Sequence, residues 1–138
     1  MVAPIELTPV GRVKSTLTDL ASAPKQGDEG APDAWLVFEP DVLPALEGLR
    51  VGDELIVLTW LDRAERTVLG VHPRGDPARP KQGVFGTRSP DRPNPIGLHR
   101  VTVLAIEGTR MRVSDLEAVD GTPLVDVKPV LSGDVGER

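Results

Sequence analysis

Cationic and rigid residues are concentrated in one stretch of the chain, GVFGTRSPDRPNPIGLHRV, which runs from Gly83 to Val101. Each proline fixes its own φ angle, lacks a backbone donor and restricts the residue before it. A loop with these constraints loses little conformational entropy when it becomes ordered. Arg88 and Arg92 are therefore predicted to be held in place, where their planar guanidinium groups suit a carboxylate or a phosphate. Composition alone favours the simpler interpretation, a rigid surface loop with solvated arginines.

Two further residues of this stretch are suited to binding. Asn94 carries an amide that can pair with an adenine edge or with a backbone group. Gly97 permits close backbone approach just before the next strand. Residues 83–95, which contain Pro90, Pro93 and Pro95, are called the arginine–proline loop below.

A second cluster of polar residues is acidic, and it lies in DLEAVDGTPLVDVKP, residues 115–129. Asp120-Gly121 is a tight-turn signal, so Asp120 is expected to hold that turn. In the alternative interpretation, exposed backbone amides and carbonyls of the same turn bind a small ligand. The spacing of the acidic residues does not match a calcium-binding loop, which needs alternating oxygen ligands and a terminal Glu.

Several familiar kinds of chemistry have no support in the sequence. The chain has no cysteine and only two histidines, His72 and His99, neither with a companion at metal-ligand spacing. No metal is therefore expected. The sequence also lacks the glycine-rich phosphate loop, the dinucleotide-binding motif and the nucleophile elbow of hydrolases.

The overall composition predicts one small domain over residues 1–138, with a frayed tail at 131–138. The net charge of -5 argues against a general nucleic-acid coat, although it does not exclude a local basic site. Two Trp, two Phe and no Tyr supply few aromatic rings for base stacking. No signal peptide is apparent, and no apolar run reaches the roughly 20 residues of a membrane helix. A cytoplasmic location is expected.

The apolar runs predict a mainly β protein. Strands are expected within 8–15, 34–40, 54–61, 66–73, 98–108, 110–121 and 122–131. The run 54–61 is almost continuously apolar, which indicates burial on both faces, and 66–73 is expected to be its neighbour. Residues 101–116 read as a hairpin with its tip at Glu107–Thr109. A short helix is expected at 41–49, capped by Asp41. These elements predict a single small antiparallel β-barrel with one or two short helices.

Three segments together resemble one known family. GVFGTRSPDRPNPIGL, residues 83–98, closely resembles the signature of the TrmO/TsaA-like family, which has the usual form G-x-F-A-T-R-S-P-x-R-P-N-P-I-G-L. TPVGRVKS at 8–15 is similar to the family's opening strand, and VDGTPLVDVKP at 119–129 to its D-G-T-P-x-x-D-I-K-P element. The three segments agree in order and spacing, so the resemblance extends over residues 9–131.

The resemblance implies a homodimeric β-barrel methyltransferase that uses S-adenosyl-L-methionine. It implies N6-methylation of threonylcarbamoyladenosine, the modified purine beside the anticodon of certain tRNAs. The positions that match the family's cofactor contacts are Pro24, Lys25, Gln26, Asp62, Arg63, Arg88, Leu98, Ala118, Val119, Asp120 and Gly121. For Asp120, a role at the cofactor's edge then competes evenly with turn support.

The chain departs from the family pattern at several positions. Lys25 stands where arginine is usual, and lysine keeps the charge but loses the bidentate fork. Asp62 replaces a frequent histidine, His99 a common serine, and Gly86 the usual alanine. Longer bacterial relatives also carry a C-terminal extension that this chain lacks. With these departures, the resemblance still predicts the binding site of the methyl donor, whereas the identity of the methyl acceptor stays open.

The expected mechanism assigns roles to four residues. Asp62 is a candidate for assisting loss of the acceptor's proton, with water as an equal contender. Arg88 is expected to contact the cofactor, to order the loop, or to bind the substrate. Arg92 and Asn94 are expected to face the acceptor or the neighbouring subunit, with Asn94 as a second catalytic candidate. Two other functions remain open: methylation of a small molecule, and a non-catalytic barrel that binds a protein or nucleotide.

Overall fold

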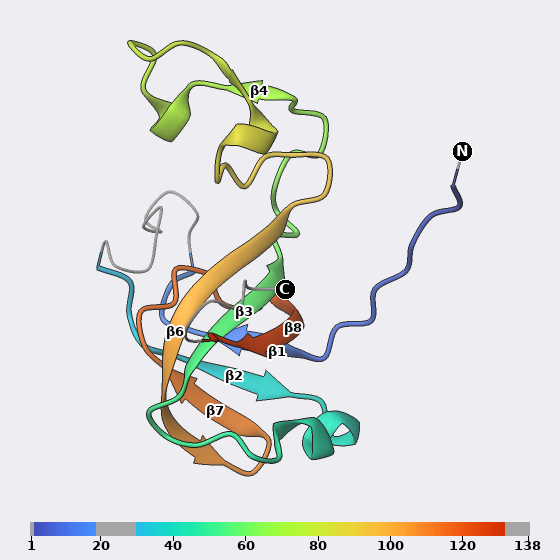
Figure 1. Ribbon diagram of the computed structural model, residues 1–138, viewed down its shortest axis with the longest axis vertical. Coiled ribbons are helices and arrows are strands. Elements are labelled where there is room, and N and C mark those ends of the chain that lie inside the picture. The colour runs from blue at the N-terminus through green and yellow to red at the C-terminus, as the bar shows by residue number, and fades with distance from the viewer. Residues whose placement is uncertain (1, 19–29, 132–138) are drawn as a thin grey trace.

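The computed structural model of the protein describes residues 2–18 and 30–131. Six strands form a closed antiparallel barrel in the order β1-β2-β7-β6-β3-β8, and β8 pairs back onto β1 (Figure 1). These strands are β1 (Gly11–Lys14), β2 (Ala34–Phe38), β3 (Glu54–Trp60), β6 (Ile96–Glu107), β7 (Arg110–Val113) and β8 (Pro123–Pro129). Closure pairs both edges of each strand, which removes a template for aggregation. The predicted fold class is confirmed.

The core fills the interior of the barrel with residues that alternate along the strands. In β6, Gly97, His99, Val101 and Val103 are buried, whereas the residues between them are more exposed. Successive strand residues point to opposite faces, so this alternation places one set inside the barrel. The largest fully buried apolar side chains are Leu36, Leu55, Met111, Leu116, Leu124, Val13, Val57, Val103 and Val113. Burying each contributes about 1.5–3 kcal/mol to folding.

The strand β3 is buried on both faces, as its sequence predicts. Leu55, Ile56 and Val57 are consecutive, and all three are buried. Its neighbours are β6 on one side and β8 on the other. The predicted hairpin is also confirmed, because Glu107 of β6 pairs with Arg110 of β7 across a two-residue tip.

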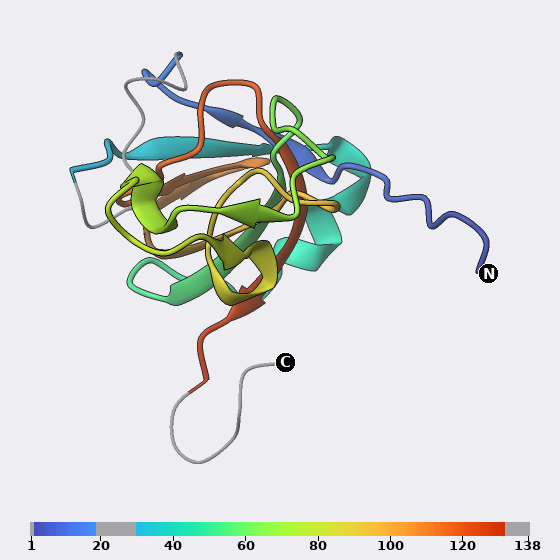
Figure 2. The same ribbon diagram turned by 90° about the horizontal axis from the view of Figure 1, so that it is seen from above.

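Residues 62–95, called the β3–β6 connection, form a smaller unit over one end of the barrel (Figures 1 and 2). Its two-stranded sheet pairs β4 (Gly70–Val71) with β5 (Gln82–Gly83). Two short 3-10 helices accompany it, η4 (Pro73–Gly75) and η5 (Val84–Gly86). The prediction that 66–73 pairs with 54–61 is wrong. Both edges of β3 are already taken by longer partners, so the only strand in this run, β4, pairs with β5 instead.

The predicted helix forms a 3-10 helix, η3, over Pro40–Leu46, and it ends before 49. Pro44 lies inside it and cannot donate a backbone hydrogen bond, which disfavours a regular α-helix. The N-cap residue is Glu39, without a side-chain cap, so the prediction that Asp41 caps the helix is wrong.

Among the described residues, no helix is both long and apolar enough to cross a bilayer. The predicted tail at 131–138 lies outside the described residues from 132 onward. The assignment of 1–138 to one domain stays a prediction.

Candidate functional site

One end of the barrel is closed by the β7–β8 turn, residues 114–122. Its backbone is tied to both flanks of the β1–β2 connection. The amide of Asp120 donates to the carbonyl of Leu17 at 2.6 Å, and the amide of Leu116 donates to that of Pro32 at 3.0 Å. Buried backbone groups need such partners, so the turn is held firmly in this place. This end of the barrel is called the site end below.

The residues that follow the C-terminal end of β3 also lie at the site end. Arg63 donates from Nη1 to the carbonyl of Thr18 at 3.3 Å, beside the Leu17 that binds the turn. The structure therefore brings the predicted pair Asp62-Arg63 and the predicted turn 118–121 to one end of the barrel. The third predicted element, Pro24, Lys25 and Gln26, lies outside the described residues, in the segment that follows Thr18.

The turn itself is supported as the sequence suggests. Asp120 accepts a hydrogen bond at Oδ1 from the amide of Ser15 at 3.0 Å, and Gly121 has a φ of 85°. A positive φ favours glycine at that position. Ala118 and Val119 are each only 4% exposed, backbone included. The amides of Asp120 and Gly121 already donate within the protein. A ligand at this turn would therefore meet the exposed Asp120.

The remaining predicted cofactor residues have exposed side chains. Leu98 is 44% exposed, because it faces outward on β6 between two inward residues. The side chains of Asp62 and Arg88 are also exposed. The hydrogen bonds and ion pairs among the described residues give the Arg88 guanidinium no partner. It is therefore open to a ligand.

Arg92 is committed to its own loop. Its Nη2 donates to the carbonyl of Thr87 at 2.6 Å and also to the carbonyl of Val84. Its Nε is buried and has no partner among the described residues. The guanidinium therefore braces the arginine–proline loop from inside. A contact between Arg92 and a substrate stays a prediction.

Arg66, which the sequence did not single out, fixes Asn94. It donates from Nε to the carbonyl of Pro93 at 2.8 Å and from Nη2 to Asn94 Oδ1 at 3.0 Å. Its guanidinium carbon also lies 5.1 Å from the centre of the Trp60 ring, a cation–π contact. Because the Asn94 oxygen accepts from Arg66, the amide nitrogen remains available as a donor.

A buried polar group lies inside the barrel at the site end, and sequence reasoning missed it. His99 donates or accepts at Nε2 with Thr59 Oγ1, 2.7 Å away, and pairs at Nδ1 with Glu117 Oε1, 2.5 Å away. A Cβ on Gly97 would lie 2.3 Å from Thr59 Oγ1 and 2.7 Å from His99 Nε2. The close approach at Gly97 is therefore made by these two side chains rather than by another backbone.

The predicted acidic cluster does not gather at one point. Asp126 lies on β8 and forms an ion pair with Lys128 at 3.7 Å, whereas Asp120 and Glu117 are held in the β7–β8 turn. Within residues 2–18 and 30–131, no three His, Asp or Glu residues lie close enough to hold a metal ion.

Comparison of the sequence with known protein families identifies the family of this chain. Residues 12–133 match the family model for the tRNA-methyltransferase O N-terminal domain. The chain belongs to this family. The resemblance drawn from the signature segments is thereby confirmed.

Curated relatives of this TrmO-type domain carry related names. A probable S-adenosyl-L-methionine-binding protein of Methanothermobacter thermautotrophicus is 44% identical over 125 residues, which cover 91% of this chain and 89% of the relative. An S-adenosyl-L-methionine-binding protein of Archaeoglobus fulgidus is 43% identical over 125 residues. The match covers 88% of this chain and 86% of that relative.

Solved TrmO structures share the fold. TrmO from Pseudomonas aeruginosa superposes with a TM-score of 0.73 at 28% identity, and a further TrmO structure with 0.75 at 30%. These matches cover 94% of this chain but only 57% and 58% of the TrmO chains. The chain thus spans a little over half the length of these TrmO proteins.

Arg66→Ala is expected to loosen the arginine–proline loop with little effect on global stability. An exposed cation contributes at most about 1 kcal/mol, but here it holds both Pro93 and Asn94. Amide hydrogen exchange at Ile96, whose amide donates to the Asn94 carbonyl, should become faster. Arg100→Ala, which removes an exposed ion pair with Glu54, is the matched control and should leave that amide unchanged. Equal exchange in both variants would refute the role of Arg66.

Proposed function

We propose that this chain binds S-adenosyl-L-methionine at the site end of the barrel and methylates N6 of threonylcarbamoyladenosine in tRNA. The observation that carries the proposal is the gathering of Asp62-Arg63 and the turn 118–121 at one end. These residues come from separate parts of the sequence, and each matches a cofactor position of the family. The names of the relatives support the cofactor, and the TrmO family supports the tRNA substrate.

The residues present at the site end fit this cofactor. An exposed guanidinium at Arg88, and a second at Arg63, suit the carboxylate of a methionine moiety. The exposed carboxylate of Asp120, in the turn 118–121, suits the polar edge of a nucleoside. The chemistry that S-adenosyl-L-methionine supplies when bound is a methyl group on a sulfonium, which a nucleophile displaces in line.

The protein's own contribution is alignment and proton removal. Holding donor and acceptor in line contributes up to roughly 7–11 kcal/mol in ideal cases. The exposed carboxylate of Asp62 can accept the acceptor's proton, directly or through water. Asn94, oriented by Arg66, presents an amide donor toward the purine, and Arg92 keeps the loop that carries it in shape.

The distribution of charge supports a nucleic-acid substrate. The chain carries a net charge of -5, yet the β3–β6 connection, residues 62–95, holds seven cationic and four acidic residues. This connection stands over the site end (Figure 1). A local positive field of this kind attracts phosphates even on an acidic protein. The location is proposed to be cytoplasmic, where tRNA is modified.

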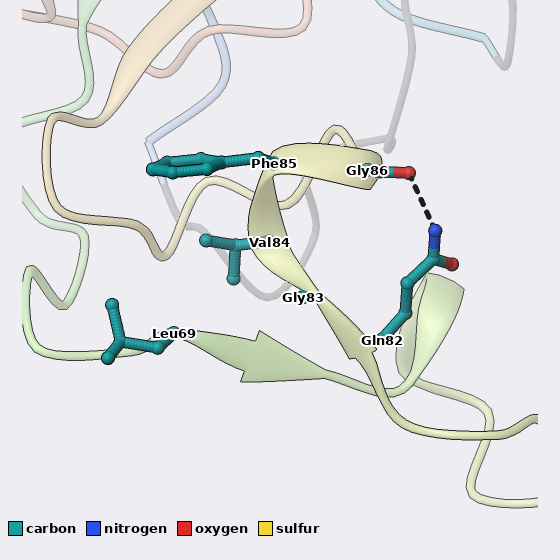
Figure 3. A pocket seen from close by; sticks show the side chains of 6 residues that line it. All are labelled: Leu69, Gln82, Gly83, Val84, Phe85 and Gly86. Atoms are coloured by element: carbon teal, nitrogen blue, oxygen red, sulfur yellow. Dashed lines mark hydrogen bonds between the residues drawn. The ribbon is translucent and has the colours of Figure 1, made fainter.

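We also propose that two copies of the chain form a homodimer through the β3–β6 connection. Phe85 is 88% exposed and Leu69 is 69% exposed. Both line a shallow hollow with Gln82, Gly83, Val84 and Gly86 (Figure 3). Large apolar side chains that gather on a surface mark an interaction site. A second copy would cover them next to the exposed Arg88.

Arg88→Ala is expected to weaken S-adenosyl-L-methionine binding by about tenfold, because a charge-assisted hydrogen bond is lost. Isothermal titration calorimetry measures the change. Arg50→Ala is the control, since Arg50 is an exposed arginine before the start of β3, at the other end of that strand. If the two variants bind the cofactor equally well, Arg88 has no role in binding it.

Radiolabelled methyl transfer should occur to tRNA that carries the threonylcarbamoyl group and not to tRNA that lacks it. Label on a small molecule in an extract stripped of RNA would instead favour a small-molecule methyltransferase. Binding of the cofactor without transfer to either would favour a non-catalytic barrel. Transfer to tRNA should also fall as salt rises, because phosphate contacts release counterions.

Phe85→Glu is expected to yield monomers, because a charge at the centre of an apolar contact is costly to bury. Light scattering with size exclusion measures the mass. Phe85→Leu, which remains apolar, is the control and should stay dimeric. A wild-type protein that elutes as a monomer at all concentrations would contradict the proposed interface.

A further inference from the structure

The His99–Glu117 pair is a buried link between two walls of the site end. His99 is 4% exposed and belongs to β6, whereas the Glu117 side chain is 15% exposed and belongs to the β7–β8 turn. Their nitrogen and oxygen lie 2.5 Å apart. A buried charged or polar pair is stable only when both partners are satisfied. This contact therefore holds the middle of the turn against β6.

The other ring nitrogen of His99 is also satisfied. Its Nε2 lies 2.7 Å from the hydroxyl of Thr59, which is completely buried in β3. Its Nδ1 pairs with the Glu117 carboxyl group, so both ring nitrogens have a partner. Two partners on opposite sides of the ring leave it one orientation. The imidazole is consequently a rigid bridge from the barrel wall to the turn.

The order Thr59–His99–Glu117 is that of a nucleophile, a base and an acid in a hydrolytic triad. Here the hydroxyl cannot meet a substrate, because Thr59 is 0% exposed. Gly97 also leaves just enough room for the two side chains to meet, since a Cβ there would lie 2.3 Å from Thr59 Oγ1. The geometry therefore serves to position other groups.

Each end of the bridge adjoins a predicted cofactor contact. Leu98 precedes His99 in β6, and Ala118 follows Glu117 in the turn. The turn is tied to the β1 side of the barrel, through Asp120 to Leu17 and Gly121 to Val13. Its first residue, Ser114, is tied to β6, because its hydroxyl accepts from the Thr102 amide at 2.9 Å. The His99–Glu117 contact is a second side-chain link from the turn to β6, three residues further along the turn and nearer to the predicted cofactor contacts.

We infer that His99 and Glu117 are a positioning pair that sets the spacing between β6 and the β7–β8 turn for the bound methyl donor. This inference rests on the proposed cofactor site. Neither residue contacts the reacting atoms, and both act through the backbone beside them. Proteins that place a smaller side chain at position 99 would need another means of fixing this spacing.

The test measures cofactor affinity and local order in the same variants. Glu117→Ala should weaken S-adenosyl-L-methionine binding by about tenfold, the equivalent of one charge-assisted hydrogen bond. Glu117→Gln retains an oxygen that accepts from His99 Nδ1, so it should restore affinity to within about threefold of the wild type. Val103→Ala is the control, because it opens a cavity elsewhere in β6 and lowers the melting temperature without touching the bridge.

Hydrogen exchange of the Asp120 and Gly121 amides gives a readout without ligand, and it should accelerate in Glu117→Ala but not in Val103→Ala. Equal affinity in Glu117→Ala and the wild type, or equal losses in Glu117→Ala and Val103→Ala, would overturn the positioning role. A wild-type protein that shows no binding heat would refute the cofactor proposal instead. The exchange rates would then still decide whether the pair orders the turn.

Discussion

The antiparallel ladder between β3 and β6 is the constraint on which the rest of the structure depends. It runs from Glu54 paired with Thr102 to Trp60 paired with Ile96. Because the two strands run in opposite directions, the chain that leaves β3 must return to the same end of the barrel. The hydrogen bond from the Leu61 amide to the Pro95 carbonyl, 2.8 Å long, closes this return. The whole arginine–proline loop is thereby anchored over the site end.

The loop is held by side chains as well as by proline. Proline limits the backbone, but the shape comes from hydrogen bonds that Arg92 makes within the loop and that Arg66 makes from outside it. Asp91 adds a further tie, because its carboxylate accepts from the Glu65 amide at 2.9 Å. Arginine suits this work because its planar group offers several donors at fixed angles. Cations in such a loop can therefore be structural as well as functional.

The site end also contains polar side chains that are buried inside the barrel. The His99 ring replaces apolar packing at a point where three elements meet, and both of its nitrogens are satisfied. Such a network is favourable only when every member has a partner. The neighbouring residues Leu116, Ala118 and Val119 are buried, so the turn packs apolar side chains beside the His99–Glu117 pair. The exposed Asp120 is the part of the turn that a ligand can meet.

The sequence by itself determined the β class, the hairpin of β6 and β7, the buried strand β3 and the family, because these depend on local patterns and on consecutive motifs. It did not determine the partners of β3, so the predicted pairing of 66–73 with 54–61 was wrong. The roles of Arg66 and His99 were decided only by the tertiary structure. Arg66 meets Asn94 across 28 positions and His99 meets Thr59 across 40. Such contacts depend on barrel closure, which has no local signal in the chain.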